Sequence, residues 1–115
     1  MKFDVVTCGS ATVDVFVDTN VHEHHRSICY NIGDKILIRD LKFSTGGGGT
    51  NTAASFSKLG LKTGYIGKLG SDNNAALILK ELKSLGVSFL GARGKENTGY
   101  SIILDSLEHE RTVLA

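Results

Sequence analysis

Four consecutive glycines, Gly46–Gly49, precede Thr50 and Asn51 and a segment of helical character. Ordering glycine costs more conformational entropy than ordering other residues, so such a run indicates unusual backbone angles or backbone pressed against another group. The run could present N–H groups at a helix N-terminus, or it could act as a hinge between two layers. Asn51 carries an amide donor and a carbonyl acceptor, which suit a sugar hydroxyl. The alternative is a flexible linker with Asn51 as an ordinary N-cap.

A carboxylate, Asp14, is the second candidate for chemistry. It lies in residues 12–18, where apolar and polar side chains alternate with the period of a half-exposed strand. Three valines occupy one face of this strand, and Asp14 is on the other face. A carboxylate can accept two hydrogen bonds from a polyol. The alternative is a solvated charge on an edge strand.

Two common nucleotide-binding motifs are absent from the sequence. The segment Gly67-Lys68-Leu69 lacks the Ser or Thr that ends a Walker loop, and only Gly9-Ser10-Ala11 follows the first predicted strand. That strand is therefore not followed by the G-x-G-x-x-G pattern of a dinucleotide-binding site. The histidines at positions 22, 24 and 25 lie in a polar segment and are expected to be solvated, so we predict no metal site.

The composition limits the possible partners. The 115 residues include 13 basic and 12 acidic side chains, a net charge of +1, which gives no reason to expect nucleic acid or an anionic membrane. No apolar stretch is long enough to span a bilayer, and the N-terminus does not resemble a secretory signal, so we expect a cytoplasmic protein. Cys8 ends an apolar run and is expected to be a buried thiol.

Strands and helices are predicted to alternate along the chain. Helices are expected from Thr50 or Asn51 to Leu59 and from a cap at Ser71 or Asp72 to Leu85. The predicted strands cover residues 3–8, 12–18, 28–30, 35–43, 63–67, 87–90, 98–104 and 111–114. This order predicts an α/β fold with a parallel sheet, together with a second, smaller sheet formed by the early strands and the last hairpin.

At these residues the chain resembles the N-terminal part of the ribokinase, or PfkB, family of carbohydrate kinases. The segment Gly9–Asp14 is similar to the opening strand of that family and its substrate-binding Asp. The segments Gly46–Ala53 and Gly64–Asp72 are similar to the first family signature, and Thr98-Gly99 fits the return to a lid. The similarity is collinear over nearly all of the chain.

The resemblance implies a partial ribokinase-like, Rossmann-like parallel sheet with helices, plus a small β lid formed by strands at about 12–18, 28–43 and 98–104. It implies phosphoryl transfer from ATP, with Mg²⁺, to a hydroxyl of a sugar or nucleoside. The lid forms a homodimer interface in several members, and the Gly46-Gly47 pair is expected to act as a hinge. The implied substrate-binding residues are Thr12, Asp14, Gly46, Gly47, Gly48 and Asn51.

Two residues depart from the ribokinase pattern, because Gly48 stands where ribokinases carry Lys and Thr12 where they carry Asn. The resemblance therefore does not imply ribose in particular. The second family signature, with the catalytic Asp and most of the ATP site, is expected beyond Ala115. We therefore expect these 115 residues alone to be inactive. The alternative is a non-catalytic sugar-binding or interaction domain derived from a kinase.

Overall fold

The computed structural model describes residues 2–115 and divides into two compact units. Unit 1 contains the residues up to Val13 together with Thr45–Tyr100, and unit 2 contains Asp14–Ser44 and Ser101–Ala115. The chain therefore passes from one unit to the other three times, at Val13–Asp14, Ser44–Thr45 and Tyr100–Ser101.

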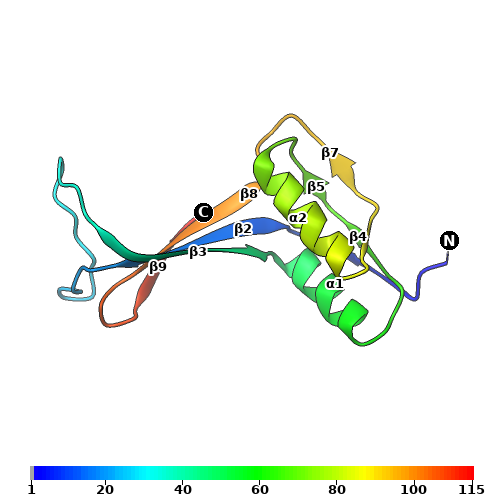
Figure 1. The fold of residues 1–115 in the computed structure, drawn as a ribbon, viewed down its shortest axis with the longest axis horizontal. Helices are drawn as coiled ribbons and strands as arrows, with labels where there is room; N and C mark the ends of the chain where they lie inside the picture. The colour runs from blue at the N-terminus through cyan, green and yellow to red at the C-terminus, as the bar shows by residue number, and fades with distance from the viewer. Residues whose placement is uncertain (1) are drawn as a thin grey trace. The chain divides into compact units, whose positions relative to one another are not determined.

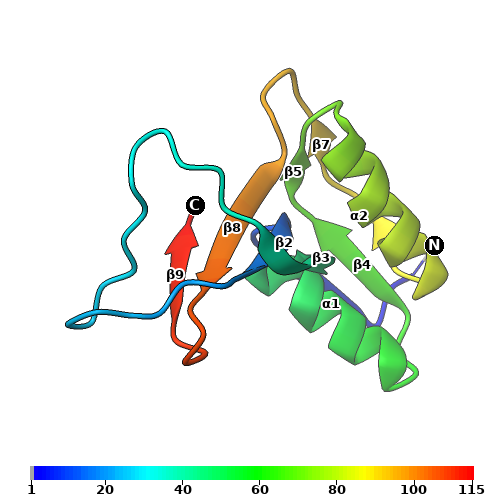
Figure 2. The ribbon, with the colours of Figure 1, turned by 60° about the vertical axis from the view of Figure 1, so that its left-hand side comes forward.

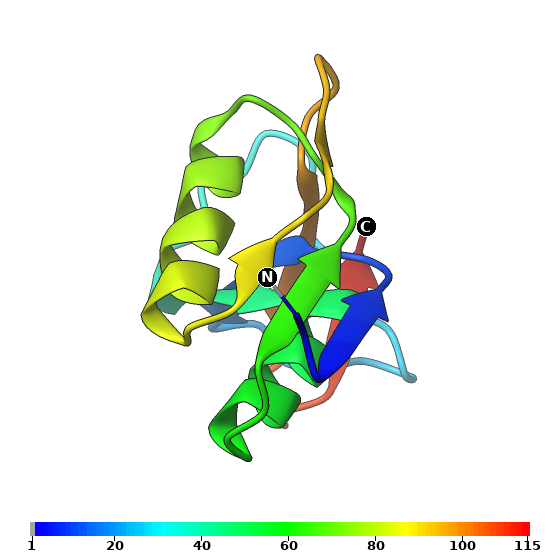
Figure 3. The same cartoon turned by 90° about the vertical axis from the view of Figure 1, so that its right-hand side faces the viewer.

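Unit 1 is built on a three-stranded parallel sheet in the order β1-β4-β6 (Figure 3). Its strands are β1 (Val5–Cys8), β4 (Thr63–Ile66) and β6 (Ser88–Phe89). Helices α1 (Gly48–Lys58) and α2 (Asn73–Ser84) connect the strands, and Figure 1 shows both beside β4. Two shorter strands, β5 (Lys68–Leu69) and β7 (Ala92–Arg93), pair in parallel outside this sheet.

The helices cover only one face of the unit 1 sheet. Tyr65 on β4 is fully buried and belongs to a core cluster with Ala53 of α1 and Ile78 of α2. Thr7 on β1 is the register partner of Tyr65. The next residue on each strand, Cys8 on β1 and Ile66 on β4, points to the other face of the sheet and is exposed. The expectation of a buried Cys8 is therefore wrong, because in this structure no helix covers its side of the sheet.

Local signals in the sequence define helix α2. Asp72 is its N-cap and accepts a hydrogen bond from the backbone N–H of Ala75 at 2.9 Å, which confirms one of the two predicted caps. The apolar stripe packs into the core, and the helix ends before Gly86, whose φ of 73° belongs to the left-handed region that favours glycine. Helix α1 differs from the prediction, because it begins at Gly48 with Gly47 as its N-cap.

Most residues of the second sheet lie in unit 2, and the order of its strands is β3-β2-β8-β9. Its strands are β2 (Thr12–Thr19), β3 (Ile38–Gly46), β8 (Gly99–Asp105) and β9 (Arg111–Leu114). Strands β8 and β9 form the predicted hairpin and pair antiparallel (Figure 2). Within unit 2, Arg39 of β3 forms an ion pair with Asp18 of β2 at 2.8 Å.

The predicted strand at residues 28–30 is wrong, and the next strand begins at Ile38 rather than Lys35. Residues 28–37 have no strand partner, and most of their side chains are exposed. Short apolar runs such as this one fit a strand pattern, but a strand also requires a neighbouring strand that pairs with its backbone groups. In the part of the chain that the structure describes, no helix has the length and apolar character needed to cross a membrane.

Candidate functional site

The N-terminus of helix α1 is capped by a residue distant in sequence. Gly47 occupies the N-cap position but has no side chain to accept hydrogen bonds from the first turn. Ser10 supplies the acceptor that Gly47 lacks, because its Oγ accepts a hydrogen bond from the N–H of Gly48 at 3.1 Å. The Ser10 carbonyl accepts from the N–H groups of Gly49 at 3.0 Å and Thr50 at 3.4 Å. These amides are therefore occupied, and the helix N-terminus does not provide a phosphate cradle.

A close contact between backbones explains why Gly49 is a glycine. A Cβ at this position would lie 2.7 Å from the carbonyl carbon of Gly9 and 2.7 Å from Cε2 of Tyr65. The Tyr65 hydroxyl donates to the Gly9 carbonyl at 2.8 Å, and Thr7 Oγ1 donates to the Gly49 carbonyl at 2.9 Å. Burial raises the pKa of Tyr65 above its ordinary value. Helix α1 is thus fixed against the segment that follows β1.

Gly46, Gly47 and Gly48 have different environments. Gly46 is buried at the end of β3. Gly47 has φ 102°, in the left-handed region, and its backbone is so close to Ser10 that a Cβ would collide with the Ser10 carbonyl oxygen. Gly48 is exposed, and a Cβ there would meet no atom within 4 Å.

Asn51 lies in the first turn of α1 and is exposed. Its N–H donates to the carbonyl of Gly47 at 2.9 Å, and its carbonyl accepts from Ser55 Oγ at 3.0 Å. The interpretation of Asn51 as a plain N-cap is therefore wrong, because the cap is Gly47 and Asn51 lies inside the helix. Its position in the first turn leaves the amide side chain on an accessible surface beside the glycines.

Thr12 and Asp14 both lie on β2, but in different units. Thr12 is half-buried in unit 1, where its Cγ2 lies 3.3 Å from the position that a Cβ of Gly99 would take. Asp14 is the first residue of unit 2 and is also half-buried. Unit 1 therefore contains five of the six predicted substrate-binding residues, those at positions 12, 46, 47, 48 and 51.

The roles of Ser10 and Tyr65 were not predicted from the sequence. The signal for Ser10 was a Gly-Ser pair directly after a strand, which is a turn pattern but does not indicate which helix the serine caps. Tyr65 looked like an ordinary strand residue, although a buried Tyr hydroxyl usually has a hydrogen-bond partner.

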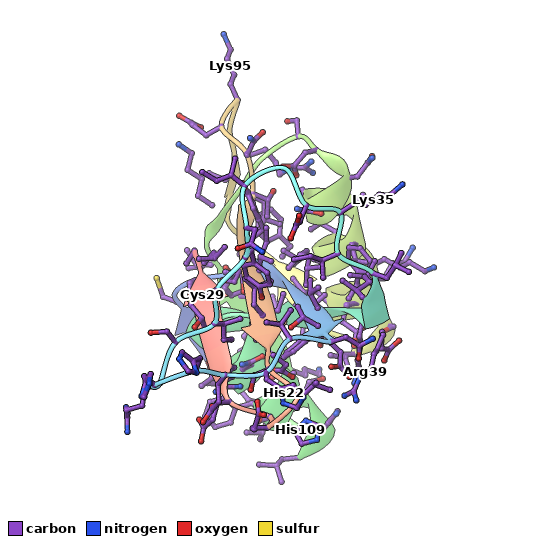
Figure 4. The ribbon with its side chains drawn as sticks, turned by 90° about the vertical axis from the view of Figure 1, so that its left-hand side faces the viewer. His22, Cys29, Lys35, Arg39, Lys95 and His109 are labelled. Carbon is purple, nitrogen blue, oxygen red and sulfur yellow. The ribbon has the colours of Figure 1, made fainter. Side chains whose placement is uncertain are left out.

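A second polar network in unit 1 joins the start of α2 to the segment before β8. Asp72 accepts hydrogen bonds from the N–H of Thr98 at 2.8 Å and from its hydroxyl at 2.7 Å. Thr98 Oγ1 in turn accepts from the N–H of Gly70 at 2.9 Å. The hydrogen bonds from Thr98 and from Ala75 lower the pKa of Asp72 to about 2, with the Thr98 hydroxyl as the largest cause. Beyond this network, Lys95 points outward from the loop between β7 and β8 (Figure 4).

The histidines of unit 2 are surface groups. His22 Nδ1 lies 2.6 Å from Oε1 of Glu108, whose other oxygen accepts from the N–H of Glu23 at 2.9 Å. Hydrogen bonds from Glu23 and then His22 lower the pKa of Glu108 to about 2. His22 and His109 are both labelled in Figure 4. Among residues 2–115, no three His, Cys, Asp or Glu side chains are grouped as metal ligands.

A family model described as pfkB family carbohydrate kinase matches residues 2–115. The chain belongs to the pfkB family. Among curated pfkB relatives, the 5-dehydro-2-deoxygluconokinase of Listeria monocytogenes serotype 4a (strain HCC23) is 33% identical over 89 residues, which cover 76% of this chain and 23% of the relative. The ATP-dependent ribose-1-phosphate kinase of Halopiger xanaduensis is 39% identical over 56 residues, 49% of this chain and 19% of that protein. The chain thus spans about a quarter or less of the length of the curated relatives that it matches.

Solved structures show the same fold. The ribokinase of Arabidopsis thaliana, in complex with ribose and ATP, superposes with a TM-score of 0.81 and 25% identity, covering 99% of this chain and 36% of that one. A microbiome-derived acarbose kinase superposes with a TM-score of 0.79 at 21% identity, over 99% of this chain and 36% of that one. The predicted pfkB membership and α/β fold are therefore confirmed.

Proposed function

We propose that the protein phosphorylates a hydroxyl group of a sugar or nucleoside with ATP. The observation that carries this proposal is the pfkB match over residues 2–115, which includes the glycine run, Asn51 and Asp14. The arrangement at the start of α1 supports it, because Gly48 and Asn51 are exposed on a helix turn whose backbone is held by Ser10 and by the contact with Tyr65. Such fixed groups can orient a small polar ligand without reorganising when it binds.

In this proposal Asn51 and Asp14 bind substrate hydroxyls, and Thr12 and the backbone of Gly46–Gly48 line the site. A carboxylate and an amide together supply the acceptors and donors that a polyol requires. We further propose that the sheet strands of unit 2 form the lid. The Gly46-Gly47 pair would be its hinge, since one of the three passages between units, Ser44–Thr45, precedes it directly. A closing lid excludes water from the phosphoryl group.

ATP and Mg²⁺ are proposed as cofactors of the activity, but we assign no residue of this chain to either. The amides at the start of α1 are poor candidates for ATP phosphates, because Ser10 already accepts hydrogen bonds from three of them. The general base and the nucleotide site are likewise not assigned to these residues. We accordingly propose that the 115 residues alone bind substrate without transferring phosphate.

A homodimer through the unit 2 sheet is part of the proposal. Strands β3 and β9 are at the ends of the sheet order, and both carry exposed apolar side chains, including Phe43 at 58% and Val113 at 51% exposure. Exposed strand edges with apolar side chains favour pairing with another chain. Sedimentation velocity of the wild type and Phe43→Lys tests this, since the variant is expected to shift toward monomer.

The central experiment is a thermal-shift and binding screen of the purified protein against sugars and nucleosides, including D-ribose and 5-dehydro-2-deoxygluconate. We expect at least one polyol to raise the melting temperature of the wild type, and Asn51→Ala and Asp14→Ala to reduce this shift. Asn73→Ala is the matched control, because Asn73 is an exposed asparagine in the first turn of α2. Binding without transfer in the complete protein would favour the sugar-binding alternative, and absence of any polyol binding would refute both.

A further inference from the structure

Three adjacent glycines at the start of α1 differ in what the fold demands of them. Gly47 requires glycine because its φ of 102° is unfavourable for other residues and a Cβ would collide with Ser10. Gly49 requires glycine because a Cβ would lie 2.7 Å from the backbone of Gly9. Gly48 meets neither condition, since its φ is not positive and a Cβ would find open space for 4 Å.

The backbone amide of Gly48 gives no reason for glycine either. Its N–H already donates to Ser10 Oγ at 3.1 Å, so it is not available to bind an anion. Glycine within a helix is less stable than alanine, because its backbone loses more freedom on folding. Gly48 therefore carries a stability cost that no contact in the fold explains.

The surroundings of Gly48 point to a ligand as the explanation. Gly48 is exposed in the first turn of α1, and Asn51 is three residues later, so both residues share one face of the helix. We propose that Gly48 determines specificity, because its missing side chain leaves room for a substituent of the bound sugar. The size of the residue at position 48 then limits the largest sugar that the site accepts. This inference rests on the proposed function, since it takes Asn51 to bind a substrate hydroxyl.

The test compares Gly48→Ala and Gly48→Leu with the wild type. The matched control is Ala76→Leu, which adds apolar bulk at an exposed position in the first turn of α2. Dissociation constants of the complete protein are measured by calorimetry for D-ribose, D-fructose, 5-dehydro-2-deoxygluconate and maltose, which differ in size. Melting temperatures without ligand are measured in parallel.

The measured quantity is the dissociation constant of the largest sugar that the wild type binds, divided by that of the smallest. We expect Gly48→Leu to raise this ratio by roughly tenfold or more. Gly48→Ala is expected to raise it less and to melt at or above the wild-type temperature, and Ala76→Leu to leave the ratio unchanged. An unchanged ratio in Gly48→Leu overturns the inference while the proposed function stands. A lower melting temperature for Gly48→Ala also overturns it, because the glycine would then have a structural role. If the wild type binds none of the sugars, this inference and the proposed function fail together.

Discussion

Replacing each of two neighbouring glycines by alanine should change stability in opposite directions. Gly48→Ala adds a methyl group in open space, and Gly49→Ala adds the same group against the Gly9 backbone and the Tyr65 ring. The two positions are consecutive in the first turn of α1. Their helix propensities therefore change in the same way, and the surroundings decide the difference.

The magnitudes follow from the contacts. Alanine is favoured over glycine in a helix by up to about 1 kcal/mol, so Gly48→Ala is expected to be neutral or to stabilise by up to about 1 kcal/mol. At Gly49 the added Cβ would lie 2.7 Å from two carbon atoms, about 1 Å inside normal contact distance. Overpacking of this kind costs about 1–3 kcal/mol and outweighs the propensity gain. We therefore expect a net loss of about 1–2 kcal/mol for Gly49→Ala.

Urea unfolding followed by circular dichroism measures both effects. The midpoint should rise or stay constant in Gly48→Ala and fall in Gly49→Ala, with similar slopes for all three proteins. A Gly49→Ala variant as stable as Gly48→Ala would show that the Gly9–Gly49 contact does not constrain the chain. This result would refute the account of how α1 is fixed.

Three further predictions concern the groups that hold the site and its surroundings. Tyr65→Phe keeps the ring but leaves the Gly9 carbonyl without its donor. The free energy of unfolding, measured by urea titration, should therefore fall by about 1–3 kcal/mol. No change would mean that water replaces the hydroxyl. Ser10→Ala removes the acceptor for the Gly48 N–H and should cost roughly 0.5–2 kcal/mol, as for loss of an N-cap, with Ser84→Ala as a surface control. The Asp72 pKa of about 2 lies below its ordinary value of 3.8, so its stabilising effect is complete above about pH 4 and is lost as the pH falls toward 2. The urea midpoint should therefore drop less between about pH 4 and pH 2 in Asp72→Asn than in the wild type. An equal drop in both proteins would contradict the lowered pKa of Asp72.

Elements with local signals were predictable from the sequence. Helix α2 carries its own cap at Asp72, its own apolar stripe and its own glycine stop at Gly86, so its prediction was correct within a residue or two. The β8–β9 hairpin was likewise predictable, because its two strands are close in sequence.

The errors arose where distant residues decide the outcome. The start of α1 was placed two or three residues late, because its cap comes from Ser10, 38 residues before Gly48. Cys8 was expected to be buried, but its exposure depends on which face of the sheet the helices cover. The apolar residues near position 28 were expected to form a strand, and only the sheet pairing shows that they have no partner.

The sequence by itself determined the family resemblance and the alternation of strands and helices, because these depend on residue types and short spacings; its assignment of hydroxyl-binding residues stays a prediction. Only the tertiary structure distinguished the glycines from one another, since identical residues in one run differ solely in what lies next to their Cα atoms. Ser10 and Tyr65 approach the run from segments that are distant in sequence. These contacts make Gly47 and Gly49 necessary to the fold and leave the space beside Gly48 open.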